Sequence, residues 1–317
     1  MKQGGEAVVP VHALTVDVES WLDTEAARRR SALLGEARRI EEGTARLLDF
    51  FSAHGVRATF FVLGRVAEEA PRMVRRIAEA GHELASHGWS HRPLQELTPQ
   101  AFREEIRATK AILEDIGGRE VTGHRSPSWS MGPRTLWALE ELVAAGYRYD
   151  ASLTPGYAWL WGTPGIPGGP HRLELGGATL LEFPNSVPRA GLRLPFAGGF
   201  FLRAWPAGWI RRALRWYEEQ GDPAVVYVHP WEVDPAMPRV RLGPFWSFVH
   251  YAGLARMEAR LRELLQTCRF LPLAELAKLL PADRLPVVRL APPVQAPAGG
   301  RDARSRSRHT ARPATRR

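Results

Sequence analysis

The sequence is poor in cysteine and has no long apolar run, and each shortage excludes a class of protein. Cys268 is the only cysteine in 317 residues, so the chain forms no internal disulfide and no thiolate-rich zinc site. A metal would therefore take its ligands from His, Asp or Glu. No stretch approaches the ~20 consecutive apolar residues of a membrane-spanning helix, and the first residues lack the apolar core of a signal peptide. We therefore expect a cytoplasmic protein.

Positive charge is concentrated at the C-terminal end. The formal net charge is +9, but residues 301–317 alone contain seven Arg and one Asp. The rest of the chain is close to neutral, and its basic residues are interleaved with Glu along predicted helices, as in AFREEIRATKAILED. We expect a solvated surface on the folded body and no nucleic-acid partner for it. Nucleic-acid binding by the arginine tail is the alternative, and deletion of 301–317 would test it.

Short apolar runs alternate with helical patterns in the first half of the chain. Buried strands are predicted within 12–19, 56–64, 82–86 and 120–126, and helices over 40–55, 70–81 and 98–118. Short links between strands and helices imply right-handed crossovers and a parallel sheet, so the fold class is α/β. With 44% hydrophobic residues, the chain can bury one large core or two modest ones.

The second half is less regular. Residues 154–172 are rich in Gly, Pro and Trp and predict a loop over the rim of the sheet. Further on, the patterns predict a helix over 209–221, a strand within 223–235 and an amphipathic helix over 250–268. From residue 284 onward Pro, Ala and Arg dominate, so we expect 284–317 to be a disordered tail.

Polar side chains follow several of the predicted strands. Asp17 and Glu19 lie at the end of the first strand, and His87, Arg125 and His229 come directly after later ones. The carboxyl ends of parallel strands meet at one edge, where functional residues gather. We therefore expect these side chains to lie close together.

Two histidines and two carboxylates within this set suggest a metal centre. His87 and His91 are four residues apart, and their imidazoles share a face if the segment turns helically. Asp17 and Glu19 point to the same face of a regular strand, where they would repel one another unless a cation or an arginine met them. The alternatives are that the histidines are capping or surface residues and that the strand frays and leaves both acids in solvent.

A set of two His and a carboxylate with open positions is typical of a hydrolytic metal site. One acid would hold the metal and the other would act as general base. His229 could serve as general acid, and Arg125 could pair with the free carboxylate. A structural histidine before Pro230 and a surface arginine are the alternatives.

Four motifs, LTVDVES, HELASHGWSH, GHRSPSWS and VVYVHPWEVDP, carry a family resemblance in their order and spacing. Together they resemble the NodB-homology polysaccharide deacetylases of carbohydrate esterase family 4. They look most like the subfamily encoded with exopolysaccharide and exosortase (PEP-CTERM) loci. The resemblance covers about residues 10–280. It implies a distorted (β/α)7-type barrel with a C-terminal helical extension, which we expect to occupy residues 1–283.

The resemblance also implies roles for individual residues. Asp17 matches the catalytic base, His229 the acid, Arg125 the arginine that orients the base, and His87 and His91 the metal ligands. Where the family has two adjacent aspartates, Val18 occupies the second place, so Glu19 becomes the metal carboxylate. Zinc is the expected ion, with nickel, cobalt or iron as alternatives. The expected substrate-binding positions are Trp129, Trp231, Pro127 and Asp150, of which Asp150 is also a candidate supporting acid.

The implied activity is metal-dependent removal of N-acetyl groups from an amino-sugar glycan or its precursor, in exopolysaccharide biosynthesis. Two alternatives remain open. One is an amidohydrolase of the same fold, with or without a metal, that opens small cyclic amides or ureides. The other is a carbohydrate-binding protein without catalytic activity.

Overall fold

A single sheet of ten strands is the frame of the part of the chain that the computed structural model describes, residues 11–28, 39–156, 162–188, 194–281 and 283–290. The strand order is β10-β6-β7-β5-β4-β3-β2-β1-β8, and β9 also pairs with β1. The strands are β1 (Val11–Val18), β2 (Thr59–Val62), β3 (Glu83–Ser86), β4 (Gly123–His124), β5 (Tyr149–Asp150), β6 (His171–Leu175), β7 (Ala178–Glu182), β8 (Val225–Val228), β9 (Arg269–Leu271) and β10 (Val287–Arg289).

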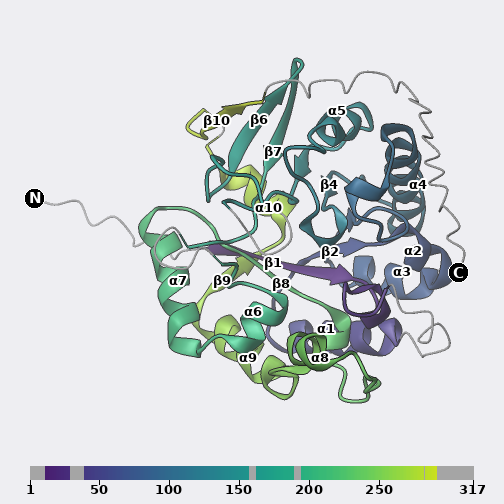
Figure 1. The fold of residues 1–317 in the computed structure, drawn as a ribbon, viewed down its shortest axis with the longest axis vertical. Helices are drawn as coiled ribbons and strands as arrows, with labels where there is room; N and C mark the ends of the chain where they lie inside the picture. Colours follow the sequence, from purple (N-terminus) through teal and green to yellow (C-terminus); the bar gives the residue numbers. More distant parts are fainter. Residues whose placement is uncertain (1–10, 29–38, 157–161, 189–193, 282, 291–317) are drawn as a thin grey trace, which may run out of the picture.

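Helices connect these strands and cover the sheet. Figure 1 shows α2 to α5 gathered on one side of the molecule and α6 to α9 gathered at another. The helices are α1 (Ile40–Ala53), α2 (Gly64–Glu69), α3 (Pro71–Glu79), α4 (Pro99–Gly117), α5 (Trp137–Ala144), α6 (Gly199–Ala204), α7 (Ala207–Glu219), α8 (Pro244–Tyr251), α9 (Met257–Thr267) and α10 (Leu273–Leu279). No helix among the described residues is both long enough and apolar enough to cross a bilayer.

The predicted α/β architecture is confirmed. Strands β1 to β5 pair in parallel, and only the β6–β7 hairpin is antiparallel among the described pairings. The register aligns Asp17 with Phe61 across β1 and β2, and Phe61 with Ala85 across β2 and β3. The carboxyl ends of these strands therefore meet at one rim.

Helix α4 shows how local signals fix the element ends. The Thr98 hydroxyl accepts a hydrogen bond from the Ala101 N–H at 3.2 Å, and Pro99 occupies the first turn. Gly118 ends the helix with φ +64°, a conformation that favours glycine. Between these ends a single face is buried, consisting of Phe102, Ile106, Thr109 and Leu113.

The predicted helix over 250–268 is wrong in its first part. Helix α8 ends at Tyr251, and α9 begins only at Met257, after a 3-10 turn over Leu254–Arg256. Gly253 between them has φ +75°, and a Cβ there would lie 2.4 Å from the Arg203 carbonyl oxygen. The close approach of α6 breaks the helix at this glycine.

Two expectations for the irregular segments also need correction. The predicted loop over 154–172 leads into an unpredicted hairpin, β6–β7, which begins at His171, while 157–161 lie outside the described residues. The predicted tail from 284 begins too early, because β10 pairs in parallel with β6, with Val288 opposite Leu173. Residues 291–317 lie outside the described part of the chain.

Candidate active site

The carboxyl end of β1 supplies two carboxylates. Asp17 lies on the strand, Val18 turns into the main hydrophobic core, and Glu19 follows the strand end. The Glu19 N–H donates to the Asp17 carbonyl at 3.0 Å, so the chain turns tightly here. Both carboxylates are buried and line one cavity, as the sequence predicted, although Glu19 reaches it through a turn rather than through strand alternation.

Arg125 holds Asp17 in place. Its Nη1 donates to Asp17 Oδ1 at 2.7 Å and to the Thr15 hydroxyl at 2.9 Å, and its Nε donates to the Ala151 carbonyl at 3.2 Å. The guanidinium lies 4.1 Å from the centre of the Phe61 ring and 4.4 Å from that of Trp129. A fully buried arginine fixed on so many sides holds its partner carboxylate in one orientation.

Glu19, His87 and His91 form a buried cluster. One ligand atom from each lies within 4.8 Å of the others. Glu19 Oε2 is 3.4 Å from His87 Nε2 and also contacts His91 Nε2. The three predicted ligands therefore lie together, and their metal-binding role stays a prediction.

The two histidines meet in a different way from the predicted helical turn. Residues 87–91 form a loop in which Gly88 has φ +73° and His91 φ +60°. A left-handed histidine is strained, typically by ~1 kcal/mol or more, and such strain gathers at functional sites. The loop geometry, and not a shared helix face, brings the imidazoles together.

The surroundings of this cluster suit a cation. Nδ1 of His87 is 2.8 Å from the Arg125 carbonyl oxygen, which fixes the proton on Nδ1 and leaves the Nε2 lone pair toward Glu19. Nε2 of His87 and both nitrogens of His91 are buried without a well-oriented hydrogen bond to any described residue. Zinc lies ~2.0–2.2 Å from imidazole and carboxylate ligands, which places neighbouring ligands at spacings like the 3.4 Å observed between Glu19 and His87.

Burial and neighbouring charges shift the pKa values of Glu19 and His91 in opposite directions. Burial raises the pKa of Glu19, but His91 and His87 outweigh it, so the Glu19 pKa falls well below its ordinary value. Burial lowers the pKa of His91, but the Glu19 carboxylate raises it above its ordinary value. Glu19 is therefore an anion at neutral pH, as a metal ligand must be.

His229 lies beside Glu19 and is paired with Glu232. Its Nδ1 is 2.9 Å from Glu232 Oε2, and its Nε2 is 3.7 Å from Glu19 Oε1. Burial lowers the pKa of His229, but Glu232, Glu19 and Asp17 raise it to about 9. The imidazole is therefore protonated at neutral pH, the state that a general acid needs.

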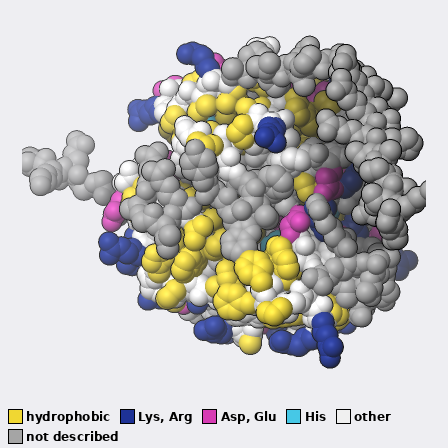
Figure 2. Space-filling model, in the orientation of Figure 1, with side chains coloured by type: hydrophobic (Ala, Val, Ile, Leu, Met, Phe, Trp, Pro, Cys, Tyr) yellow, Lys and Arg dark blue, Asp and Glu magenta, His cyan; other side chains and the backbone are white. Residues whose placement is uncertain are grey.

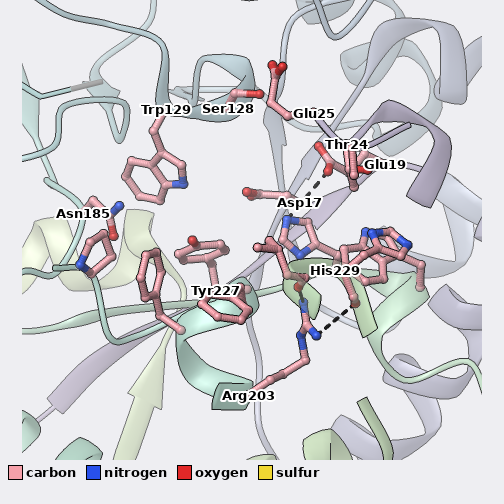
Figure 3. A pocket seen from close by; sticks show the side chains of 18 of the residues that line it. Asp17, Glu19, Thr24, Glu25, Ser128, Trp129, Asn185, Arg203, Tyr227 and His229 are labelled. Carbon is pink, nitrogen blue, oxygen red and sulfur yellow. Dashed lines mark hydrogen bonds and ion pairs between the residues drawn. The ribbon is translucent and has the colours of Figure 1, made fainter. Parts of the chain in front are cut away.

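These groups line one cavity of about 230 Å³, whose walls come from both halves of the chain. Figure 3 shows Asp17, Glu19 and His229 on one side, with Trp129 and Asn185 on the side away from Glu19. Trp129 and Trp231, both predicted to bind substrate, line it. The Trp231 ring is stacked between His229, at a centroid distance of 5.4 Å, and His250, at 4.7 Å.

Two other predicted substrate-binding residues do not line the cavity within the described part of the chain. Pro127 is buried in the 3-10 turn Pro127–Trp129, where it helps to direct Trp129. Asp150 is fully buried and accepts hydrogen bonds from the Ser152 hydroxyl at 2.7 Å and its N–H at 3.1 Å, beside His124 Nδ1 at 2.9 Å. Both residues therefore lie outside the described lining of this cavity, and their role in substrate binding stays a prediction.

Sequence reasoning missed several residues of the site. Glu232 lies three positions after His229. In the sequence this spacing indicates only a turn and gives no sign of a functional pair. The second oxygen of Glu232, Oε1, accepts from Arg203 Nε at 2.6 Å. Asn185 lines the cavity, and its buried Oδ1 has no hydrogen-bond partner among the described residues. Only the folded chain brings these positions to the site.

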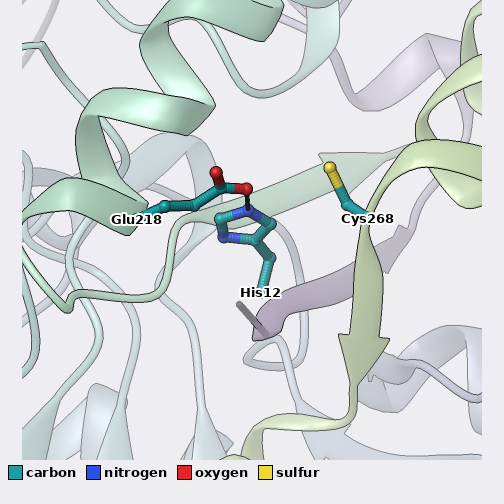
Figure 4. A group of neighbouring side chains, drawn as sticks. All are labelled: His12, Glu218 and Cys268. Carbon is teal, nitrogen blue, oxygen red and sulfur yellow. Dashed lines mark hydrogen bonds and ion pairs between the residues drawn. The ribbon is translucent and has the colours of Figure 1, made fainter. Parts of the chain in front are cut away.

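A second cluster of possible ligands, His12, Glu218 and Cys268, lies at the other end of β1 (Figure 4). His12 Nδ1 accepts from the Ala224 N–H at 3.1 Å, so the proton of the neutral ring is on Nε2, which is 3.2 Å from Glu218 Oε1. Burial also raises the pKa of the Cys268 thiol. With a protonated nitrogen and a protonated thiol, this cluster is a hydrogen-bonded pair beside a cysteine.

Comparison with known families agrees with this geometry. Residues 13–149 match the family model described as polysaccharide deacetylase. Residues 151–278 match a model described as a domain of unknown function, DUF3473. The deacetylase segment carries Asp17, Glu19, His87, His91 and Arg125, and the DUF3473 segment carries His229 and Glu232.

Curated relatives match about a third of this chain. The peptidoglycan-N-acetylglucosamine deacetylase of Bacillus cereus is 37% identical over 101 residues, which cover 32% of this chain and 37% of the relative. The chitooligosaccharide deacetylase of Sinorhizobium fredii is 30% identical over 134 residues, which cover 36% of this chain and 62% of the relative. The chain therefore spans less than two thirds of the length of each.

A solved structure matches almost the whole chain. A protein from Mycobacterium smegmatis, assigned as a polysaccharide deacetylase, superposes with a TM-score of 0.62 at 22% identity, covering 92% of this chain and 96% of its own. Similarity at this level shows a common fold. It confirms the predicted NodB-type barrel architecture.

Proposed function

We propose that the chain is a metal-dependent hydrolase that removes N-acetyl groups from the amino sugars of a glycan. The observation that carries this proposal is the convergence of three units on one cavity: the Asp17–Arg125 pair, the Glu19, His87 and His91 cluster, and the His229–Glu232 pair. They supply a base, a cation site and an acid, the groups that amide hydrolysis requires.

Glu19, His87 and His91 would hold the metal, with zinc as the expected ion. When bound there, it would lower the pKa of a water molecule and polarise the acetyl carbonyl. The residues hold their orientation without it, because the Arg125 carbonyl fixes the His87 ring and the tight turn after β1 fixes Glu19. This rigidity favours binding by a pre-arranged site.

Proton transfer can be assigned to two side chains. Arg125 engages Asp17 Oδ1, which leaves Oδ2 to take the proton of the attacking water. Glu232 orients His229 through Nδ1, so Nε2 faces the cavity and can donate its proton to the departing amine. Base and acid thus follow adjacent strands, β1 and β8.

The cavity walls suit a sugar. The indole N–H groups of Trp129 and Trp231 and the Asn185 Oδ1 are buried without a hydrogen-bond partner among the described residues. A sugar hydroxyl both donates and accepts, so it can satisfy either kind of atom, and aromatic faces pack on the apolar faces of sugar rings. Relatives named for peptidoglycan and chitooligosaccharides support an acetylated amino-sugar glycan as the substrate class.

We propose further that the glycan is an exopolysaccharide or its precursor, which the subfamily resemblance of the four motifs supports. The cytoplasmic location predicted from the sequence stays a prediction, and cell fractionation would test it. Recovery of the protein from the periplasm would contradict it.

The test is acetate release from a panel of N-acetylated amino-sugar polymers and oligomers, before chelation, after chelation and with zinc restored. We expect release that chelation abolishes and zinc restores. Release that chelation leaves unchanged would reject the metal-dependent mechanism and reassign Glu19. If no sugar releases acetate but cyclic amides or ureides are opened, the substrate class is wrong.

A further inference from the structure

Several stretches of the chain contain no acidic residue, and one of them carries exposed aromatic side chains. The 23 residues 235–257 include Arg239, Arg241 and Arg256 but no Asp or Glu. The stretch contains α8, whose neighbours in the chain are these three arginines. Positive charge is therefore segregated here, in contrast to the mixed charge of α4.

Two large aromatic side chains are exposed on α8. Phe245 is 52% exposed and Phe248 is 61% exposed, and a spacing of three residues places them on one face of the helix. The Phe200 ring of α6 lies 5.5 Å from that of Phe248. Figure 2 shows hydrophobic side chains gathered on this face, over the place of α6 and α8 in Figure 1. We call Phe200, Phe245 and Phe248 the aromatic patch.

The arginines before α8 lie beside it in space as well as in sequence. The Val240 N–H donates to the Tyr251 hydroxyl at 2.9 Å, which ties the segment 239–241 to the end of α8. The Arg239 guanidinium lies 5.2 Å from the centre of the Tyr251 ring. Arg239 and Arg241 are both exposed. Cations therefore adjoin the aromatic patch, and no acid within 235–257 neutralises them.

The aromatic patch also adjoins the catalytic cavity. Trp246 and Val249 of α8 line that cavity, as does Phe200, a member of the patch itself. Residues 245 and 248 are not among its described lining. A surface that bound α8 would therefore lie next to the cavity without filling it.

We propose that α8, the aromatic patch and Arg239 and Arg241 dock this protein on an anionic lipid bilayer. Phenylalanine side chains enter the boundary between headgroups and acyl chains, and arginines are attracted to anionic headgroups. The segment 235–257 itself adds no negative charge that anionic headgroups would repel. Docking in this way presents the catalytic cavity to molecules carried at the bilayer surface, and it does not depend on the proposed hydrolysis.

The test is flotation of the full-length protein with vesicles of phosphatidylcholine alone and of phosphatidylcholine mixed with phosphatidylglycerol. We expect binding to the mixed vesicles, and a loss of about tenfold or more when Phe245→Ser and Phe248→Ser are combined. Arg239→Gln with Arg241→Gln should weaken binding to mixed vesicles and make it less sensitive to salt.

Leu279→Ser is the matched control, because Leu279 is 64% exposed but belongs to α10 and not to α8. It should bind like the wild type. Binding by the double Phe variant at the wild-type level would overturn the proposal and assign the attraction to the arginine tail. Absence of binding to either kind of vesicle would overturn the proposal as well. So would the finding that the aromatic patch binds a soluble glycan and does not bind vesicles. Vesicle binding is measured without turnover, so its failure is separate from a failure of the proposed hydrolysis.

Discussion

Asp17 and Glu19 are two carboxylates two residues apart, but their partners differ. Asp17 is held by Arg125, whereas Glu19 faces His87 and His91. We expect Glu19→Ala to lose bound zinc and activity together, because it removes the anionic ligand. Asp17→Asn should keep zinc but lower turnover by ~10²–10⁴-fold, because it removes only the base. Zinc content after dialysis and the rate of acetate release on the same samples measure both effects.

Full zinc occupancy and rate in Glu19→Ala would show that the first motif has been misinterpreted. Glu25→Ala is a suitable control, since Glu25 also lines the cavity but pairs with Arg28 at 2.8 Å. It should retain zinc.

The positions of the site residues were predictable where they follow strands. Parallel strands end at one rim, so the positions of Asp17, His87, Arg125 and His229 after apolar runs were sufficient to bring them together. The contacts of Asp150 were not predictable in this way. Its burial behind Arg125, beside His124 and Ser152, depends on β4 and β5 lying side by side, which local sequence does not encode.

Among the elements, the junction between α8 and α9 depends on one glycine. Gly253 has φ +75° and lies against the Arg203 carbonyl, while Arg203 Nη1 donates to the carbonyls of His250 at 3.1 Å and Ala252 at 2.5 Å. Gly253→Ala should therefore destabilise the protein by ~2–4 kcal/mol, because the new Cβ clashes and its backbone conformation is strained. Urea unfolding measures the change.

Gly208→Ala provides the comparison for this substitution. Gly208 lies in α7, and a Cβ there would meet only the flexible end of Arg211 at 3.8 Å. It should be neutral or stabilise by ~0.5–1 kcal/mol. Equal losses of stability in the two variants would contradict the role assigned to Gly253.

The elements that sequence reasoning found are those with their own end signals. Thr98 and Gly118 mark the ends of α4, and the prediction for that helix is confirmed. The break at Gly253 was missed because the amphipathic pattern continues across it, and the cause is a close approach by α6 from elsewhere in the chain. The β6–β7 hairpin was missed because the preceding Gly- and Pro-rich run suggested a loop throughout.

For the whole molecule, His82 makes stability depend on pH. The side chain is buried against Phe60, and its Nδ1 accepts from the Ala58 N–H at 3.2 Å. Burial, with a smaller contribution from Arg57, lowers the pKa of His82 to about 4 from 6.5. The unfolded chain then binds the extra proton between these values. The free energy of unfolding is therefore highest above about pH 6.5. It falls by ~3 kcal/mol as the pH is lowered to about 4.

The variant His82→Asn isolates this effect, because the amide oxygen can replace Nδ1 as an acceptor and does not titrate. The free energy of unfolding in urea should fall more steeply with acid in the wild type than in the variant. Parallel curves between about pH 7 and pH 4 would exclude His82 as a source of acid sensitivity.

The net charge of the folded body was predicted correctly from the sequence, but where the charges lie was not predicted. The near-neutral body suggested evenly mixed charge, which holds for α4. The acid-free segment 235–257 carries cations and exposed aromatic rings together. A net charge averages over such segments, so only the folded arrangement reveals the basic and aromatic surface beside the cavity.

The division of the site between the two family segments has a consequence for descent. The proposed base and the three candidate ligands lie within 13–149, and the proposed acid pair lies within 151–278. Pairing of residues 13–16 of β1 with residues 225–228 of β8 joins the two segments. Replacing one segment alone with that of a distant relative would change the pairing of β1 with β8. The proton donor and the proton acceptor would then no longer be matched in position. The two segments are therefore expected to be inherited as one unit, and recombination at residue 150 should yield inactive hybrids.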